Sequence, residues 1–222
     1  MLLSILIPTL EERKLLLTRL LSKLHGQIER DNYQDRVEIH LLCDSREMST
    51  GAKRNALIDM ANGEFVAFVD DDDDVHEDYI RLIVTALSEH PDVDCLGITG
   101  LIYFRGSHPH RFVHSLQYDQ YFSRDGVYYR PPYILNPIRR AIAQQFRFAE
   151  TSYAEDAEWA MRIARARALH AEYFLDATLY RYLSRRSWFL QWSLDITEPL
   201  RHPLGLQFAN GVRCKRWLSS RL

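Results

Sequence analysis

Five consecutive aspartates at residues 70–74 constrain the fold of this chain more than any other feature, because of what precedes them. The sequence FVAFV at residues 65–69 is typical of a short buried strand. Five like charges repel one another and usually mark a solvated or disordered stretch. Here they begin where the strand ends, which is the place where open α/β sheets bind ligands. Carboxylates packed this closely need a counter-charge, and we expect a hard divalent cation that also holds a diphosphate.

The composition is that of an ordinary soluble globular protein with one core and room for an appendage. The chain has 222 residues, of which 46% are hydrophobic and 26% are charged. Its formal net charge of −2 provides no bulk basic field for nucleic acid. The charge is uneven, however, since residues 185–222 contain seven lysines and arginines, two acidic residues and five Trp or Phe side chains. This tail is either a terminal helix with a solvated basic face or a surface for an anionic acceptor or a membrane.

Cysteine usage and the lack of long apolar runs indicate a location inside the cell. The three cysteines, at positions 43, 95 and 214, are widely spaced and form no CxxC pair, so we expect a reducing compartment. No run approaches the ~18 apolar residues of a spanning helix, and residues 1–10 lack the basic leader of a secretion signal. We therefore expect a cytoplasmic protein, with peripheral contact of the tail at the inner membrane face left open.

Strand-like and helix-like segments alternate along the first hundred residues, which predicts a parallel sheet with helices on both faces. Apolar runs predict strands at residues 2–8, 37–43, 65–69 and 93–104, and helical spacing of apolar residues predicts helices at 11–28, 52–61 and 79–90. Residues 105–132 interrupt this alternation and are expected to form loops or a hairpin. Beyond them, Asn136-Pro137 is typical of a helix start. A helix at 154–168 and a strand at 172–182 follow.

Five short segments in a fixed order make the chain similar to a known family. They are SILIPT at residues 4–9, LLCD at 41–44, GAKRNA at 51–56, GEFVAFVDDDD at 63–73 and EDAEWAMR at 155–162. The set spans about residues 3–182 and resembles the GT-A glycosyltransferases, in particular family 2. The resemblance implies a Rossmann-like α/β fold with a mixed, mostly parallel sheet flanked by helices. It also implies a GT-A domain at 1–184, with a nucleotide-binding half at 1–104 and an acceptor half at 105–184, and leaves 185–222 as a basic, aromatic helical extension.

The resemblance implies a metal-dependent, inverting transfer of a sugar from a nucleotide-diphospho-sugar, favouring a UDP-sugar, to a hydroxyl of a glycan or lipid-linked acceptor. Asp44 matches the aspartate that binds the nucleotide base in the family, and Thr9 and Glu11 would line the same pocket. Glu11 is equally explained as a favourable charge in the first turn of a helix. Lys53 and Arg54 lie near a helix N-terminus, which favours anions, and Arg54 is the preferred contact of the two. The alternative for Lys53 is a solvated face.

The register of the aspartates follows from the resemblance and from strand geometry. Family members usually read Asp-x-Asp-Asp followed by His-x-Asp, and residues 76–78 supply that ending as His-Glu-Asp. Side chains two apart in an extended segment point the same way, so Asp70 and Asp72 form the expected pair. Asp72 would bind Mn²⁺ or Mg²⁺, Asp70 would contact the ribose or the metal indirectly, and Asp71 would be a further nucleotide contact. A shift to Asp71 and Asp73 is the alternative.

Two other readings of the acidic and histidine-rich segments are weaker. The aspartates lack the glycine and distal glutamate of an EF-hand, and a purely structural acidic turn remains a minor alternative. His108, His110 and His114 lie close together in the chain, but no cysteine or acid at ligand spacing accompanies them as a zinc site would require.

An inverting transfer needs a carboxylate that accepts the proton of the attacking hydroxyl. By resemblance, this catalytic base is Asp156, with Glu155 as its neighbour. Adjacent helical residues point about 100° apart, so the two cannot both face the acceptor; Glu155 is also explained as a favourable charge at the helix N-terminus. Trp159 either packs in the core or forms a wall under the sugar, and the core is favoured.

The chain departs from the family at one place. Many relatives carry a histidine shortly after the final strand, and this chain has none there. Any contact with metal or phosphate at that point would come from one of three arginines: Arg181, Arg185 or Arg186.

Two rival functions remain on the sequence alone. A sugar-nucleotide nucleotidyltransferase also uses carboxylate-bound metal on a similar sheet, but its first loop is usually rich in glycine and the loop at residues 7–13 has none. A non-catalytic nucleotide-sugar-binding protein on a GT-A-like frame would not need to keep all the acidic positions.

Overall fold

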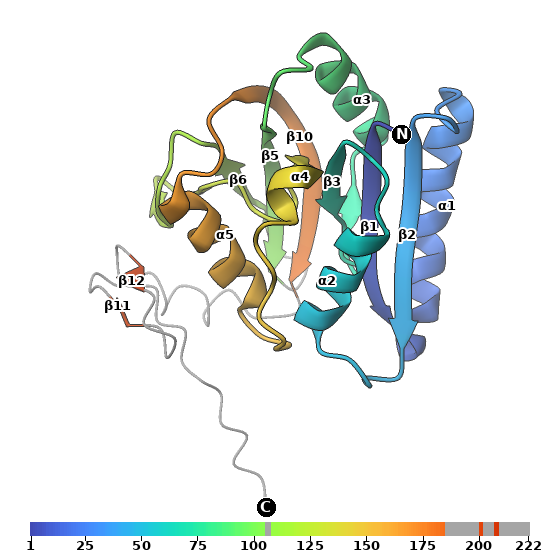
Figure 1. The fold of residues 1–222 in the computed structure, drawn as a ribbon, viewed down its shortest axis with the longest axis horizontal. Helices are drawn as coiled ribbons and strands as arrows, with labels where there is room; N and C mark the ends of the chain where they lie inside the picture. Colours follow the sequence, from blue (N-terminus) through green and yellow to red (C-terminus); the bar gives the residue numbers. More distant parts are fainter. Residues whose placement is uncertain (105–107, 185–199, 202–206, 209–222) are drawn as a thin grey trace, which may run out of the picture.

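A sheet of ten strands forms the centre of the protein, and helices cover both of its faces (Figure 1). The computed structural model describes residues 1–104, 108–184, 200–201 and 207–208. The sheet is mixed, and its longest pairings are parallel. The strand order is β2-β1-β3-β9-β5-β6-β8-β7, with β10 paired to β5 and β4 paired to β10.

The first half of the chain forms three parallel strands, as predicted. β1 (Leu3–Leu10) lies between β2 (Val37–Asp44) and β3 (Phe65–Phe68). Almost every residue of β1 is buried, because helices pack on both faces of the sheet at this point. All three strands therefore end at one edge of the sheet, where the loops that follow them meet.

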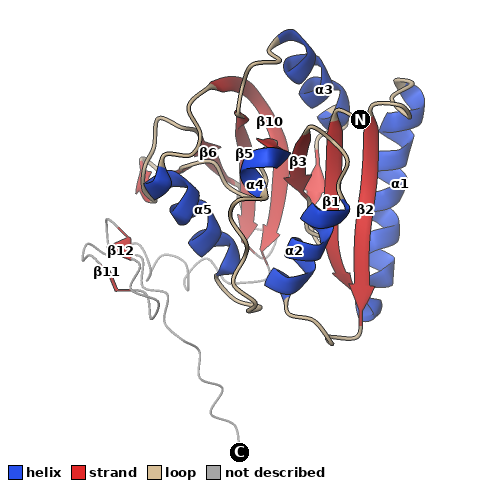
Figure 2. Cartoon of the chain, viewed as in Figure 1, coloured by secondary structure: helices blue, strands red, loops and turns tan. Residues whose placement is uncertain are grey.

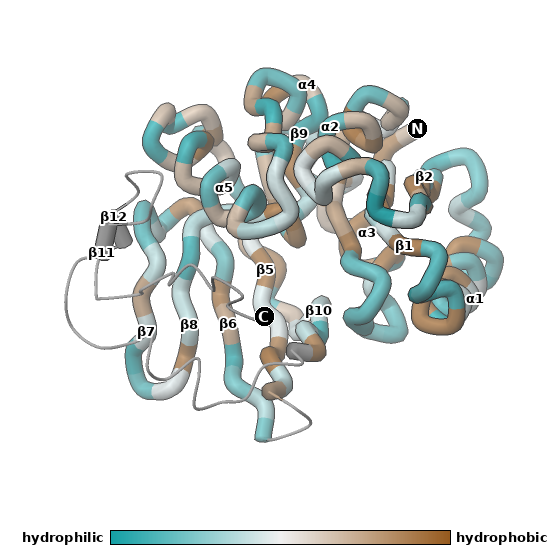
Figure 3. Tube along the Cα trace, turned by 90° about the horizontal axis from the view of Figure 1, so that it is seen from below, coloured by the Kyte–Doolittle hydropathy of each residue, from teal (hydrophilic) through white to brown (hydrophobic). Residues whose placement is uncertain are grey.

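This half of the chain also contains four helical segments; the first two connect β1 to β2, the third connects β2 to β3, and the fourth follows β3 and the acidic run. They are η1 (Glu11–Arg13), α1 (Lys14–Arg30), α2 (Thr50–Met60) and α3 (Tyr79–Glu89). α1 packs against α3, whereas α2 packs against α5 (Glu155–Ala166). Figures 2 and 3 show α2, the short α4 (Arg140–Ala143) and α5 on one side of the sheet and α1 on the other. The predicted helix at 154–168 is confirmed by α5.

The second half of the chain completes the sheet with mostly antiparallel strands. β5 (Cys95–Phe104) pairs with β6 (His110–His114), and β7 (Phe122–Arg124) and β8 (Val127–Arg130) form the hairpin expected within residues 105–132. Its turn contains Asp125 and Gly126, both with positive φ, a conformation that glycine adopts without strain. β10 (Glu172–Ser184) confirms the predicted final strand and runs parallel to β5. β4 (Asp74–Val75) pairs antiparallel to β10.

The helix start predicted at Asn136-Pro137 is wrong. The next residues form β9 (Ile138–Arg139), which pairs antiparallel with β3, and α4 begins only after it. Asn136 is 1% exposed; its side-chain oxygen accepts a hydrogen bond from the Tyr133 amide at 2.8 Å, and its side-chain nitrogen donates to the carbonyl of Leu96 at 2.8 Å. Its amide group therefore joins two strand regions instead of capping a helix.

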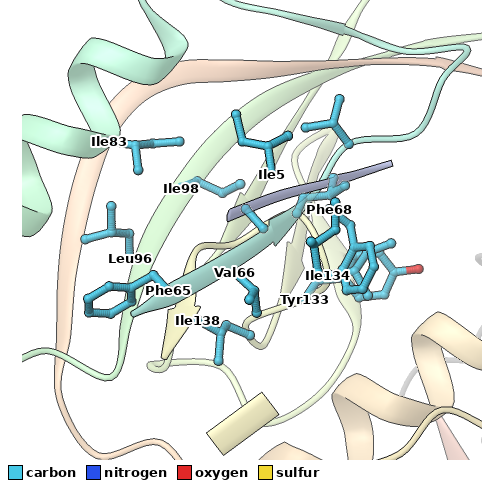
Figure 4. Packing of buried hydrophobic residues seen from close by; sticks show 14 of the residues in the cluster. Ile5, Phe65, Val66, Phe68, Ile83, Leu96, Ile98, Tyr133, Ile134 and Ile138 are labelled. Carbon is cyan, nitrogen blue, oxygen red and sulfur yellow. The ribbon is translucent and has the colours of Figure 1, made fainter. Parts of the chain in front are cut away.

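The core lies along β1, β3 and β5. Figure 4 shows Ile5, Val66 and Phe68 packed with neighbouring side chains from β5 and from the segment before β9. Trp159 of α5 is 1% exposed and stacks on Phe148, with ring centroids 4.7 Å apart. Trp159 is therefore a core residue, as favoured from the sequence.

The predictions for residues 185–222 fall almost entirely outside the described residues. Two short strands are described there, β11 (Leu200–Arg201) and β12 (Gln207–Phe208), and they pair antiparallel with each other. These four residues are strand, which differs from the helix expected for this segment. Across the part of the chain that the structure describes, no helix is long and apolar enough to cross a membrane.

Candidate active site

Two adjoining cavities open where the parallel strands end. The larger one has a volume of about 760 Å³ and is lined by the end of β1, Arg13 of η1, the loop before α2 and the first three aspartates of the run. The smaller one has a volume of about 130 Å³ and is lined by β6, β8, α5 and the segment before β9. Asp70 and Tyr182 line both cavities. A ligand that fills the larger cavity can therefore reach the smaller one past Asp70.

The last two aspartates of the run turn away from the larger cavity. The Asp73 carboxylate accepts hydrogen bonds from the Tyr180 hydroxyl and from the Leu183 amide, each at 2.8 Å. Asp74 lies in β4 and accepts a hydrogen bond from the Lys23 ammonium at 2.6 Å. Both carboxylates thus join the acidic loop to β10 and α1, and they leave the cavity side to Asp70, Asp71 and Asp72.

Asp71 is the buried member of these three. Its side chain is 1% exposed, and it accepts hydrogen bonds from the Thr9 hydroxyl at 2.5 Å and from the Arg13 guanidinium at 2.7 Å. Arg13 also lies 3.4 Å from the Asp72 carboxylate, which is 24% exposed. Asp71 therefore holds Thr9 at the end of β1 in place and keeps the Arg13 guanidinium beside Asp72. The sequence offered no signal for Arg13, because its partners lie about sixty positions further along the chain.

Both basic residues of α2 point inward. Ser49 caps this helix by accepting a hydrogen bond from the Ala52 amide at 3.2 Å. Lys53 is 3% exposed, donates to the carbonyl oxygen of Thr9 at 2.6 Å and forms an ion pair with Asp44. This burial excludes the solvated-face alternative for Lys53, whose ammonium instead ties the end of β1 to the end of β2.

Arg54 lies between two carboxylates that come from different parts of the chain. Its guanidinium donates to Asp70 at 3.0 Å and lies 3.8 Å from the Glu155 carboxylate. It is also packed over the rings of Phe68 and Phe148, at 5.3 and 5.8 Å from their centroids. Within the described residues, two of its guanidinium nitrogens have no hydrogen-bond partner. Arg54 thus joins the acidic loop to the start of α5.

The neighbours Glu155 and Asp156 occupy different environments. Glu155 is 5% exposed, and burial, with the adjacent Asp156 charge, raises its pKa to about 7 although Arg54 opposes the shift. Asp156 lines the smaller cavity and forms a hydrogen bond with the phenol of Tyr133. Of the pair, Asp156 is therefore the carboxylate that a substrate in the smaller cavity can reach.

Of the three residues expected near the nucleotide base, Thr9 lines the larger cavity, whereas Asp44 and Glu11 do not. The Asp44 carboxylate accepts hydrogen bonds from the amides of Met48 at 2.8 Å and Arg46 at 3.2 Å. Glu11 accepts a hydrogen bond from the Ser45 hydroxyl at 2.6 Å. Asp44 and Glu11 instead organise the loop after β2, and that loop supplies part of the cavity wall through Arg46 and Met48.

The donor groups of the larger cavity fit a hard divalent cation. Asp70 and Asp72 present carboxylate oxygens, which Mg²⁺ and Mn²⁺ prefer. No group of three or more metal-ligating side chains occurs within residues 1–104 and 108–184. A cation bound at Asp72 would therefore complete its shell with diphosphate oxygens and water, as Mg²⁺ usually does at phosphate sites.

Of the three arginines suggested at the end of the final strand, the structure describes one, and it does not line the larger cavity. Arg181 pairs with Asp74 at 3.1 Å, and Arg185 and Arg186 lie outside the described residues. His114 is buried and forms a hydrogen bond with Asn136, and burial holds its pKa well below the ordinary value, so it is neutral. The described histidines thus form no zinc cluster.

A mixed, mostly parallel sheet with carboxylates at its strand ends defines a GT-A architecture, and the chain belongs to glycosyl transferase family 2. The model of that family matches residues 38–163, more than half of the chain. Two crystal structures of S. aureus TarS residues 1–349, one in complex with UDP and one with UDP-GlcNAc, are similar to it, with TM-scores of 0.58 and 0.57. The fold expected from the sequence is therefore confirmed.

The two TarS structures are distant in sequence from this chain, and the matches cover only part of them. Each TarS structure is 18% identical to this chain, and the matches cover 83% and 84% of this chain. They cover 61% and 60% of the TarS chains, so the chain spans less than two thirds of their length. At this identity the similarity shows a shared fold. No curated protein matches the chain.

Proposed function

We propose that the chain is a metal-dependent, inverting glycosyltransferase that uses a UDP-sugar. One observation carries this proposal: Asp70 forms a wall shared by two cavities, with Asp72 on the larger side and Asp156 on the smaller side. A metal-binding acid and a proton acceptor thus flank one junction, as transfer of a sugar between two substrates requires. The complexes of TarS with UDP and UDP-GlcNAc support the choice of donor, and membership of family 2 supports the reaction type.

In this proposal the donor occupies the larger cavity, whose volume of about 760 Å³ suits a ligand of this size. Asp72, with Asp70 nearby, would hold Mn²⁺ or Mg²⁺, which as a Lewis acid stabilises the negative charge of the departing diphosphate. Arg13 lies beside Asp72 and lines the same cavity, so it can add positive charge there. Asp44 and Glu11 position the loop that faces the nucleotide.

Asp156 is the proposed catalytic base. The acceptor hydroxyl oxygen attacks the anomeric carbon from the face opposite the diphosphate, and the bond from that carbon to the diphosphate breaks. The diphosphate leaves with the electron pair, and the hydroxyl proton moves to the Asp156 carboxylate. Glu155 acts differently, because it is buried against Arg54 and positions Asp70 through that guanidinium.

The second half of the GT-A domain, residues 105–184, would bind the acceptor, a glycan or lipid-linked hydroxyl. Its strands β6 and β8 line the smaller cavity beside Asp156. The tail at 185–222 remains a proposed acceptor or membrane contact, and a cytoplasmic location with peripheral membrane contact remains a prediction.

A thermal-shift screen of nucleotides tests the proposal. UDP with Mn²⁺ should raise the melting temperature more than UDP with EDTA, and more than GDP or ADP with Mn²⁺, because a ligand that binds only the folded state stabilises it by mass action. Equal shifts for all three nucleotides, or none with UDP, would contradict the donor assignment. Release of pyrophosphate from a nucleoside triphosphate and a sugar phosphate would instead favour a nucleotidyltransferase.

A further inference from the structure

Arg130 is the positively charged side chain of the smaller cavity. It ends β8 and lines the cavity together with Asp156. Its guanidinium lies over the rings of Tyr121 and Tyr133, with distances of 5.2 and 5.6 Å to their centroids. Stacking on two aromatic rings restricts the plane of the guanidinium, so that its donors are held in a fixed direction.

Arg130 has no counter-ion among the residues that the structure describes. Within the described residues, no carboxylate oxygen lies within 4.0 Å of Arg130, and its side chain makes no hydrogen bond. The arginines that line the larger cavity differ, because Arg13, Arg46 and Arg54 each form an ion pair with a carboxylate. A charge that is partly removed from water without a partner is costly. Among the described residues, Arg130 is therefore a cation without an ion-pair partner, although the carboxylates of Asp70 and Asp156 line the same cavity.

The other titratable groups around Arg130 do not supply the missing anion. His114 on β6 is neutral, because burial and the Arg130 charge both lower its pKa. Tyr121 and Tyr133 remain protonated, since burial raises the pKa of each. Asp156 on α5 and Asp70 line the same cavity, but neither makes an ion pair with Arg130 in the described structure, and Asp70 is paired with Arg54.

We propose that Arg130 binds a phosphate or carboxylate group of the substrate, one that lies next to the reacting centre. This inference rests on the proposed function, which places the acceptor in the smaller cavity. A cavity of about 130 Å³ has room for one such group, and the guanidinium fork matches two oxygens of either. A neutral substrate that displaced water there would leave the guanidinium unpaired, so Arg130 also selects against it. The anion belongs either to the acceptor or to the sugar of the donor.

Paired charged and neutral probes test the inference and separate these two sources. Glycerol 3-phosphate is compared with glycerol as an acceptor fragment, by saturation-transfer NMR in the presence of UDP and Mn²⁺. UDP-glucuronate is compared with UDP-glucose as a donor, by titration calorimetry. Arg130→Gln removes the charge and Arg130→Lys keeps it without the fork. Arg124→Gln, on the exposed part of β7 in the same hairpin, is the control.

The wild type should bind the charged member of one pair at least about tenfold more tightly than the neutral member, a typical effect of a charge-assisted hydrogen-bonded pair. Arg130→Gln should abolish that preference while leaving the affinity for UDP unchanged, Arg130→Lys should keep part of it, and Arg124→Gln should keep all of it. A preference for glycerol 3-phosphate assigns the anion to the acceptor, and one for UDP-glucuronate assigns it to the donor.

The inference is overturned if the wild type shows no preference in either pair, or if Arg130→Gln retains it. If Arg130→Gln does not fold, Arg130→Lys decides, since an unchanged preference in that variant contradicts a role for the guanidinium fork. Failure of the proposed function is distinct, because it would abolish binding of UDP itself in the same samples.

Discussion

The two cavities are charged in different ways. The arginines of the larger cavity already have carboxylate partners inside the protein, and Lys53 pairs with Asp44. In the smaller cavity, Arg130 and Asp156 line one space, with Tyr133 in contact with both, and form no ion pair with each other. The first cavity is thus built around charges that position one another. The second keeps a guanidinium and a carboxylate apart, so that each can contact a substrate.

The two cavities are joined through α2 and α5. The amide of Gly51, in the first turn of α2, donates to the carbonyl of Thr151 at 2.9 Å, just before α5. Arg54 of the same helix reaches Asp70 and Glu155. A change in this contact region should therefore affect both cavities, whereas a change inside one cavity should leave the other intact.

Replacing the proposed base should give the largest effect. Asp156→Asn should lower the rate of UDP release from the preferred UDP-sugar by about 10²–10⁴-fold, the usual contribution of general base catalysis. The affinity for UDP should not change, because Asp156 lines only the smaller cavity. Both are measured by a UDP-release assay and by calorimetry.

Glu158→Gln is the matched control for this experiment, since Glu158 lies on the same helix and pairs with Arg162. It should keep the wild-type rate. If Asp156→Asn weakened UDP binding as much as it slowed UDP release, the functional separation of the cavities would be wrong.

Gly51→Ala should destabilise the region where the two cavities join. A Cβ at this position would overlap the carbonyl oxygen of Ala149, so α2 must move away from the segment before α5. We expect a loss of about 2–3 kcal/mol in the free energy of unfolding, measured by urea denaturation. Gly26→Ala, in the exposed part of α1 with no atom within 4 Å of the new Cβ, should stabilise the protein by about 0.5–1 kcal/mol. Equal effects of the two substitutions would show that the contact does not constrain α2.

Glu155→Gln should change how stability depends on pH. Folding raises the pKa of Glu155 from an ordinary 4.5 to about 7, so the folded state binds its proton more tightly than the unfolded state does. The wild type should therefore lose stability as pH rises through this window, and the variant should not. The free energy of unfolding of the variant, relative to that of the wild type, should increase by about 1–2 kcal/mol between pH 5 and pH 8, measured by urea denaturation of the ligand-free protein. If stability depended on pH in the same way in the variant and the wild type, the Glu155 carboxylate would not be buried beside Arg54 as described.

The fold of the first half could be predicted because its signals are local. Buried parallel strands give continuous apolar runs, and Ser49 caps α2 through a contact three residues away. The segment at 136–143 was misassigned because the Asn136 amide bonds to Leu96, forty positions earlier. A side chain that serves a distant strand cannot be distinguished from a helix cap within a short window of sequence.

The candidate site was predictable only in part. The extended geometry used to pair Asp70 with Asp72 does not occur, because the Asp73 amide donates a hydrogen bond to the Asp70 carbonyl at 3.1 Å and residues 70–73 form a turn. As a result, Asp71 lines the larger cavity together with Asp70 and Asp72. The burial of Asp71 depends on Thr9 and Arg13, and the smaller cavity gathers side chains from three separate segments, so no spacing indicates them. The loop role of Asp44 and Glu11 likewise depends on local contacts that their residue types do not specify.

The central claim is that Asp72, and not the far end of the acidic run, holds the cation that binds the diphosphate. The most direct test is calorimetric titration of UDP in the presence of Mn²⁺ and in the presence of EDTA. It compares the wild type with Asp72→Asn and with the control Asp74→Asn, since the Asp74 carboxylate pairs with Lys23. The wild type and Asp74→Asn should bind UDP at least about tenfold more tightly with Mn²⁺, and Asp72→Asn should lose that gain. A full manganese effect in folded Asp72→Asn, or its loss in folded Asp74→Asn, would contradict the account.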